Sequence, residues 1–132
     1  MASCIETVAS ENAPPPAGPY SQGVRAGDFV FLAGQTARTA AGPLPETAPR
    51  AEHCRQALEN LAAVAAASGG TLNQAVKVNV YLADLSWKPD FDAVYAELVG
   101  SKPARSTVCA APPTGMVEVD AVLYLATYRA EV

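Results

Sequence analysis

The sequence predicts an α+β fold in which two helices pack on one face of a mixed β-sheet. Strand-like runs lie toward both ends of the chain, and two stretches with helical periodicity lie between them. Elements segregated in this way are typical of a sheet covered by one helical layer. We expect a single domain over residues 1–132, because a chain of this length buries about two thirds of its unfolded surface in one core.

The first third of the chain is expected to form strands and loops. Met1–Thr7 is a candidate first strand, and the four prolines in Ala13–Pro19 require an extended arm. Gln22–Gly34 is predicted to be a hairpin that turns at Ala26–Asp28, because a glycine interrupts two strand-like runs there. Thr36–Pro45 contains glycine and prolines and is predicted to be a loop.

The first helix is the best-supported element of the sequence. An alanine-rich run carries apolar residues on one stripe and reaches Ser68, and the pair Gly69–Gly70 stops it. Thr47 is the expected N-cap, with Pro49 in the first turn.

The second half is predicted to begin with a strand and a helix. Thr71 and Gln74 have the spacing of a capping box, and Val76–Leu82 alternates apolar and polar residues as a half-buried strand does. Phe91–Leu98 has the apolar spacing of a second amphipathic helix, which ends at Gly100.

The last part of the chain is predicted to be a two-stranded ribbon. Pro103–Ala110 and Val117–Tyr128 both have strand composition, and only a short stretch with prolines and a glycine separates them. An antiparallel return is the economical connection. It would bring Glu118 close to the strand of Arg105, so that a guanidinium and a carboxylate flank one pocket.

Composition excludes several functional classes. The net charge is −4 and no window concentrates lysine and arginine, so the electrostatic signature of nucleic-acid binding is missing. No apolar run approaches the roughly 20 residues that would span a membrane, and no targeting segment is evident, so we expect a cytoplasmic protein.

Cysteine and histidine usage argues against a disulfide framework or a metal site. The three cysteines are odd in number and widely spaced, which suits reduced thiols, and Cys54 and Cys109 are expected to be small buried hydrophobic residues. His53, the single histidine, lies among charged neighbours and is expected to be solvated.

The final strand is apolar on both faces from Ala121 to Leu125. A sheet covered on one side only would leave half of these side chains exposed. We therefore expect a symmetric partner subunit to cover the second face, although further packing within the chain would serve as well.

Several short motifs together resemble the RidA/YjgF family of enamine and imine deaminases. Each is weak alone, but their order and spacing match over nearly the whole chain. They are Glu11–Pro14 with Gly18–Gln22, Leu32–Gln35, Val76–Leu85, Pro103–Ser106 and Val117–Ala121.

The resemblance implies a chorismate-mutase-like fold and a homotrimer with three active sites between subunits. It implies that Arg105 binds the substrate carboxylate and that Glu118 holds the hydrolytic water. It also implies that Tyr20 lines the cleft and takes part in catalysis, that Gly34 places its backbone near the ligand, and that Thr107 joins the substrate site. No metal or organic cofactor is implied.

Three positions depart from the family pattern. Thr107 stands where some of these deaminases have cysteine, Ala33 where many relatives have serine, and Asp92 where asparagine is frequent. The loop over Ala110–Met116 is also shorter than usual. These departures affect the choice of substrate more than the type of reaction.

The function implied by the resemblance is the hydrolysis of small 2-imino or enamino acids to 2-oxo acids and ammonia, as in 2-iminobutanoate/2-iminopropanoate deaminases. Two alternatives remain. One is a trimer that binds a carboxylate ligand without turnover. The other is a pathway-specific enzyme that acts on a different imine, such as an aminoacrylate, an aminomuconate or a biosynthetic intermediate. The acidic net charge disfavours the ribonuclease activity after which some members are labelled.

Overall fold

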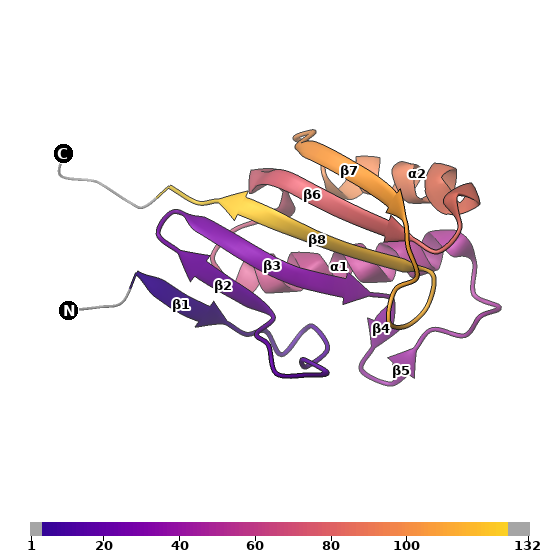
Figure 1. Ribbon diagram of the computed structural model, residues 1–132, viewed down its shortest axis with the longest axis horizontal. Helices are drawn as coiled ribbons and strands as arrows, with labels where there is room; N and C mark the ends of the chain where they lie inside the picture. The colour runs from indigo at the N-terminus through magenta and orange to yellow at the C-terminus, as the bar shows by residue number, and fades with distance from the viewer. Residues whose placement is uncertain (1–3, 127–132) are drawn as a thin grey trace.

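A six-stranded mixed sheet with two helices behind it forms the protein (Figure 1). The computed structural model describes residues 4–126. Its elements are β1 (Ile5–Val8), β2 (Gly23–Ala26), β3 (Phe29–Thr36), β4 (Arg38–Thr39), β5 (Gly42–Pro43), α1 (Arg50–Ala67), η1 (Leu72–Gln74), β6 (Ala75–Leu82), η2 (Leu85–Trp87), α2 (Lys88–Leu98), β7 (Ala104–Cys109) and β8 (Val117–Tyr124). The order in the sheet is β1-β2-β3-β8-β6-β7, and only β6 and β7 are parallel.

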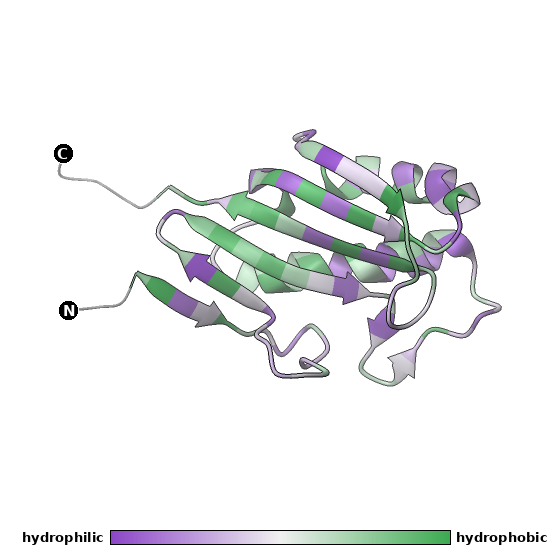
Figure 2. Ribbon diagram, in the orientation of Figure 1, coloured by the Kyte–Doolittle hydropathy of each residue, from purple (hydrophilic) through white to green (hydrophobic). Residues whose placement is uncertain are grey.

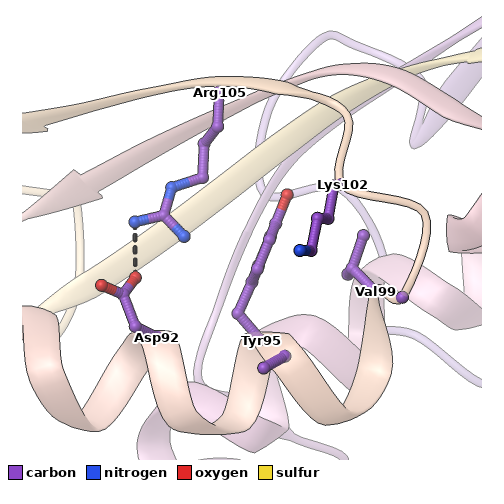
Figure 3. A pocket seen from close by; sticks show the side chains of 7 residues that line it. Asp92, Tyr95, Val99, Lys102 and Arg105 are labelled. Atoms are coloured by element: carbon purple, nitrogen blue, oxygen red, sulfur yellow. Dashed lines mark hydrogen bonds and ion pairs between the residues drawn. The ribbon is translucent and has the colours of Figure 1, made fainter.

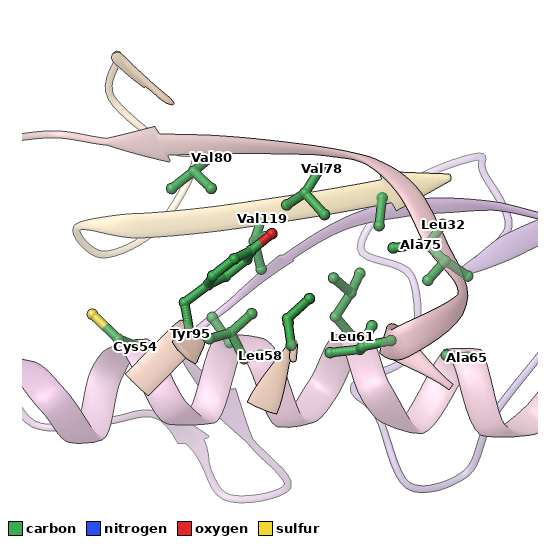
Figure 4. Packing of buried hydrophobic residues seen from close by; sticks show 14 of the residues in the cluster. Leu32, Cys54, Leu58, Leu61, Ala65, Ala75, Val78, Val80, Tyr95 and Val119 are labelled. Atoms are coloured by element: carbon green, nitrogen blue, oxygen red, sulfur yellow. The ribbon is translucent and has the colours of Figure 1, made fainter. Parts of the chain in front are cut away.

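The core lies between the helices and one face of the sheet, here called the inner face. Leu58 and Leu61 of α1 point toward Val78 and Val80 of β6 and Val119 of β8 (Figure 4). All five side chains are almost completely buried. This arrangement confirms the predicted α+β class with both helices on one face of a mixed sheet.

Two helix-end predictions have different outcomes. The capping box is confirmed: the Asn73 amide donates to the Thr71 hydroxyl and the Thr71 amide donates to the Gln74 side chain. The Thr47 cap is wrong, because α1 begins at Arg50 and Pro49 occupies the N-cap position without a side-chain cap bond. A residue that precedes proline avoids the helical region, which delays the helix beyond Ala48.

The predicted ribbon between Pro103–Ala110 and Val117–Tyr128 is wrong. β7 pairs in parallel with β6, and β8 pairs antiparallel with both β3 and β6, so that β6 separates the two strands. The inner-face residues of β8 are all buried, which suits a central strand with a neighbour on each edge. β7 is more exposed, so it can lie at the edge of the sheet. Residues 127–128 of the predicted strand lie outside the described part.

The first forty-five residues follow the predictions with small changes. Of the strand predicted over Met1–Thr7, residues 5–7 belong to β1, and residues 1–3 lie outside the described part of the chain. The Gln22–Gly34 hairpin is confirmed as β2 and β3. Thr36–Pro45 was predicted to be a loop but contains the short ribbon of β4 and β5, in which Arg38 pairs with Pro43.

One side chain near the start of α1 and one on β7 differ from their predictions. His53 is buried instead of solvated: its ring meets Trp87 edge-on at 5.7 Å, and its Nε2 lies 3.1 Å from the Pro45 carbonyl. Segments distant in sequence cover this turn, so periodicity within the helix could not indicate it. The thiols are free as expected, but only Cys54 is buried, whereas Cys109 is exposed on the edge strand.

The outer face of the sheet, which Figure 2 views, lacks a helical layer. Phe29, Phe31 and Tyr124 project from it, each more than two fifths exposed. Their neighbours Leu123 and Ala121 point to the inner face and are fully buried. The apolar run of β8 therefore does serve both faces of the sheet, as the sequence predicted. No helix in residues 4–126 has the length and apolarity needed to cross a membrane.

Candidate functional site

Arg105 lies on the inner face of β7, at the edge of the sheet above α2 (Figure 3). Its Nη2 contacts Oδ1 of Asp92 at 2.5 Å, and its Nε donates to the Thr107 hydroxyl at 3.0 Å. The side chain is only 17% exposed. Thr107 is placed beside Arg105 because residues two apart on a strand share one face. The guanidinium is therefore held at a defined position.

Two aromatic rings of α2 support the same guanidinium. Its central carbon lies 4.7 Å from the ring centroid of Tyr95 and 5.3 Å from that of Phe91. Tyr95 is placed beside Phe91 and Asp92 because residues three and four apart are neighbours on a helix surface. A desolvated cation over aromatic faces gains about 1–2 kcal/mol and loses freedom of movement.

Asp92 links Arg105 to a second cation. Its other oxygen accepts a bond from Nζ of Lys88 at 2.8 Å, one helical turn earlier. Burial alone would raise the pKa of Asp92, but the hydrogen bonds from Lys88 and Arg105 outweigh it and hold the pKa below its ordinary value. Asp92 is therefore ionised at neutral pH.

A pocket of about 300 Å³ opens beside this cluster. Arg105, Tyr95 and Lys102 line it, and Tyr95 lies between the two cationic side chains (Figure 3). Two cations beside an aromatic ring suit an anionic ligand. A larger pocket of about 540 Å³, lined among others by Arg38, His53 and Trp87, contains none of the predicted site residues.

Glu118 lies on the outer face of β8, next to the backbone of Gly34. A Cβ atom placed on Gly34 would overlap the Glu118 carboxylate, so glycine is needed for this approach. Burial and, to a smaller extent, the charge of Asp120 raise the pKa of Glu118 above its ordinary value. Within residues 4–126 the Glu118 carboxylate accepts no hydrogen bond, which leaves it free to bind water.

Asp120 has a different environment from Glu118 on the same face. Its carboxylate accepts hydrogen bonds from Asn79 Nδ2 and from the Tyr81 hydroxyl, each at 2.9 Å. Two fixed donors occupy the two oxygens. Asp120 therefore acts on Glu118 through its charge, whereas Glu118 has the free acceptor.

Tyr20 lies on the N-terminal arm and is 54% exposed. Its hydroxyl accepts a 3.3 Å bond from the Ala17 amide within its own loop. Gln22, which we did not predict as important, anchors the arm. Its side-chain Nε2 donates to the Pro14 carbonyl at 2.8 Å, and its backbone carbonyl accepts a hydrogen bond from the Ala33 amide at 2.9 Å. The second bond brings the end of the arm to the residue before Gly34.

The predicted site residues fall into two groups on opposite faces of the sheet. Arg105 and Thr107 lie on the inner face, and Gly34 and Glu118 on the outer face with the Tyr20 arm near the same strand end. The prediction that Arg105 and Glu118 flank one pocket within a single chain is therefore wrong. The partner role of Asp92 was missed, because only the packing of α2 against β7 brings it to Arg105.

Comparison with known proteins identifies the class. The family model described as Endoribonuclease L-PSP matches residues 10–125. A RutC family protein of Pyrococcus horikoshii is 40% identical over an alignment of 128 residues that covers 90% of this chain and 97% of the relative. A 2-iminobutanoate/2-iminopropanoate deaminase of Dermatophagoides farinae is 36% identical over 116 residues, with 86% and 91% coverage.

The fold agrees with this class. The crystal structure of Escherichia coli TdcF with bound serine superposes with a TM-score of 0.82 at 28% identity, covering 90% of this chain and 98% of TdcF. The chain belongs to the L-PSP family, which contains the RutC and RidA/YjgF proteins, so the resemblance seen in the sequence is confirmed.

Proposed function

We propose that this protein is a cofactor-independent deaminase that hydrolyses small 2-imino or enamino acids to 2-oxo acids and ammonia. We further propose that its active sites lie between the subunits of a homotrimer. The positions of Arg105 and Glu118, together with the deaminase named among its relatives, support both proposals.

The opposite orientation of these two side chains is the observation that carries the proposal. Arg105 is aligned with Val78 on the inner face, whereas Glu118 is aligned with Tyr81 on the outer face. One strand lies between them, and side chains on opposite faces of a sheet cannot reach one small ligand. A ligand held by both groups needs Arg105 from one copy and Glu118 from another.

The outer face provides a surface for such an assembly. Phe29, Phe31 and Tyr124 form an exposed apolar area over β3 and β8, and Ile5 extends it on β1. Association of copies through this face would bury these side chains and favour a closed oligomer. A trimer detected by sedimentation velocity would agree with this assignment, and a monomer at working concentration would contradict it.

The proposed reaction uses one cation and one base. The unoccupied end of the Arg105 guanidinium binds the substrate carboxylate in a charge-assisted pair. The Glu118 carboxylate of the neighbouring copy accepts a proton from water as that water attacks the C2 carbon of the iminium group. Glu118 then returns this proton to the nitrogen of the carbinolamine. As the C–N bond breaks and ammonia leaves, the hydroxyl oxygen forms the C=O bond of the 2-oxo acid and gives its proton to the Glu118 carboxylate, which releases it to solvent.

The environment of Glu118 suits a general base. Its pKa is raised by burial and by Asp120, which makes it a stronger proton acceptor than an ordinary glutamate. Gly34 presents no side chain at the carboxylate, so water can occupy that space. A positioned base of this kind accelerates hydrolysis by about 10² to 10⁴, which is sufficient for an imine that already reacts with water.

A coupled assay tests the activity. Threonine dehydratase generates 2-iminobutanoate, and added protein should accelerate the appearance of 2-oxobutanoate. Arg105→Ala should abolish the acceleration while the protein stays folded. Arg55→Ala is a matched control, because Arg55 pairs with Glu97 on the exposed surface of the helices. No acceleration by the wild-type protein, or full activity of Arg105→Ala, would refute the proposal.

A second candidate is binding of an amino or oxo acid without turnover. The TdcF crystal holds serine, which has no imine to hydrolyse. An arginine held in place as Arg105 is would bind a carboxylate equally well with or without chemistry. Saturable binding of serine together with no acceleration in the coupled assay would favour this candidate.

A further inference from the structure

We propose that Asp92 is a specificity-determining residue, which makes the Arg105 site prefer ligands with a cationic nitrogen beside the carboxylate over simple anionic 2-oxo acids. The inference rests on the proposed function, because a protonated 2-imino acid and its 2-oxo acid product differ by this one charge. Asp92 would then help the site distinguish substrate from product.

The hydrogen bonds of Arg105 decide where a ligand can bind. Nε donates to Thr107 and Nη2 contacts Asp92, so the side edge of the guanidinium is occupied. Nη1 has no hydrogen-bond partner among residues 4–126. A ligand carboxylate must therefore approach the end of the guanidinium formed by Nη1 and Nη2, and it shares the cation with Asp92.

Sharing the cation places two carboxylates close together. With ordinary hydrogen-bond lengths on both sides of Nη2, the ligand oxygen lies roughly 5 Å from Oδ1 of Asp92. The Asp92 side chain is 39% exposed, so solvent screens part of the repulsion. With an effective dielectric constant of about 50, between the values for a protein surface and for bulk water, the remaining repulsion weakens the binding of a single anion by about tenfold.

The surrounding charges do not cancel this effect. Lys88 and Arg105 both contact Asp92, so the three groups together carry one net positive charge, and they would carry two if Asp92 were neutral. Lys102 is a further cation that lines the pocket, and Tyr95 is neutral at pH 7. Neutralising Asp92 therefore doubles the charge of the cluster that faces an anion.

A ligand with zero net charge responds differently. In a 2-iminium acid or an amino acid the cationic nitrogen lies next to the carboxylate, so its attraction to Asp92 offsets most of the repulsion. The 2-oxo acid lacks this compensation. The site therefore retains the charged imine and releases the product more readily.

Alanine and pyruvate are a suitable pair of probes, because they have the same carbon skeleton and differ in the group at C2. Their dissociation constants can be measured by NMR titration of the wild-type protein and of Asp92→Asn. We expect Asp92→Asn to bind pyruvate about tenfold more tightly, whereas alanine binding changes less than about twofold.

Two further variants complete the test. Lys88→Met removes a positive charge from the same cluster and should weaken pyruvate binding severalfold relative to alanine. It also provides a result if Asp92→Asn fails to fold. Asp90→Asn is the matched control, since Asp90 lies on the same helix but contacts Arg50 instead of Arg105, and its ratio of the two constants should equal that of the wild type.

The results distinguish this inference from the deaminase proposal. An unchanged ratio in Asp92→Asn and Lys88→Met overturns the inference, as does equal weakening of both ligands, which would make Asp92 a positioning residue only. Binding of neither ligand by the wild type also overturns it. Imine hydrolysis with an unchanged ratio defeats the inference alone, whereas a shifted ratio without hydrolysis defeats the deaminase proposal alone.

Discussion

Arg105 and Glu118 project from opposite faces of one sheet, and β6 separates the strands that carry them. In a single copy these two groups cannot act on the same small molecule. Any chemistry that needs both requires a second copy of the chain. This relationship makes the oligomer a part of the proposed mechanism.

Mixing two inactive variants tests this relationship directly. Arg105→Ala lacks the cation and Glu118→Gln lacks the base, and each alone should have less than about 1% of wild-type activity. After unfolding and refolding together, mixed oligomers contain some sites with Arg105 from one copy and Glu118 from another. With random assembly of equal amounts, about a quarter of the sites are intact, so about a quarter of wild-type activity should return.

The variants refolded separately and then combined without subunit exchange serve as the control. They should remain inactive. If co-refolding also restores no activity while both variants assemble normally, Arg105 and Glu118 do not form a shared site between copies.

Replacing Gly34 should impair the base more than the fold. In Gly34→Ala the new Cβ overlaps the Glu118 carboxylate, and the end of that side chain must move away. We expect activity to fall by up to about 100-fold, which is typical for a displaced general base, with only a small change in thermal stability. The double variant Gly34→Ala/Glu118→Gln should be no less active than Glu118→Gln alone, because both changes act on the same carboxylate. If the loss of activity in the double variant equals the product of the two single losses, Gly34 and Glu118 act independently, which would contradict their contact.

The pH dependence of activity should reflect the environment of Glu118. The base must be ionised, and its raised pKa places the acid limb of the kcat/KM profile above the ordinary glutamate value of 4.5. Asp120→Asn removes the like charge and should move this limb to lower pH. Glu97→Gln removes a distant exposed carboxylate and should leave the limb unchanged. If the acid limb has the same pKa in Asp120→Asn as in the wild type, the ionisation of Glu118 does not determine the pH profile.

The same shift has a consequence for stability. A carboxyl group with a raised folded-state pKa favours the folded state below its unfolded pKa, and this contribution is lost as pH rises through the folded pKa. Glu118→Gln should therefore gain stability relative to wild type at neutral pH but not at pH below 4.5. Denaturant unfolding at the two pH values measures the difference.

Tyr95 offers a test of the support beneath Arg105. Its hydroxyl is buried and has no hydrogen-bond partner in the described chain, whereas its ring lies 4.7 Å from the guanidinium. Tyr95→Phe keeps the ring and removes an unpaired polar group, so the protein should be unchanged or more stable by about 1 kcal/mol. Tyr95→Ala should lose about 3–5 kcal/mol through the cavity. Urea unfolding at a fixed protein concentration compares the variants, and clear destabilisation by Tyr95→Phe would show that the hydroxyl has a partner.

Local patterns in the sequence were sufficient for most of the secondary structure. The stripe of α1, the capping box at Thr71 and the alternation of β6 depend on residues a few positions apart, so they can be predicted without knowing the fold. The family motifs likewise pointed to Arg105 and Glu118 as single residues. Their mutual arrangement was predicted incorrectly, because a short connection suggested a hairpin that does not form.

What the sequence alone determined was the α+β class, the helices and strands themselves, and the identity of an arginine and a glutamate as candidate site residues. Only the tertiary structure decided that β6 separates their strands, that they face opposite sides of the sheet, and that Asp92 joins Arg105. The physical reason is that helix and strand patterns follow from contacts between near neighbours in the chain. Strand order follows from burying one complete apolar face, to which residues far apart in sequence contribute together.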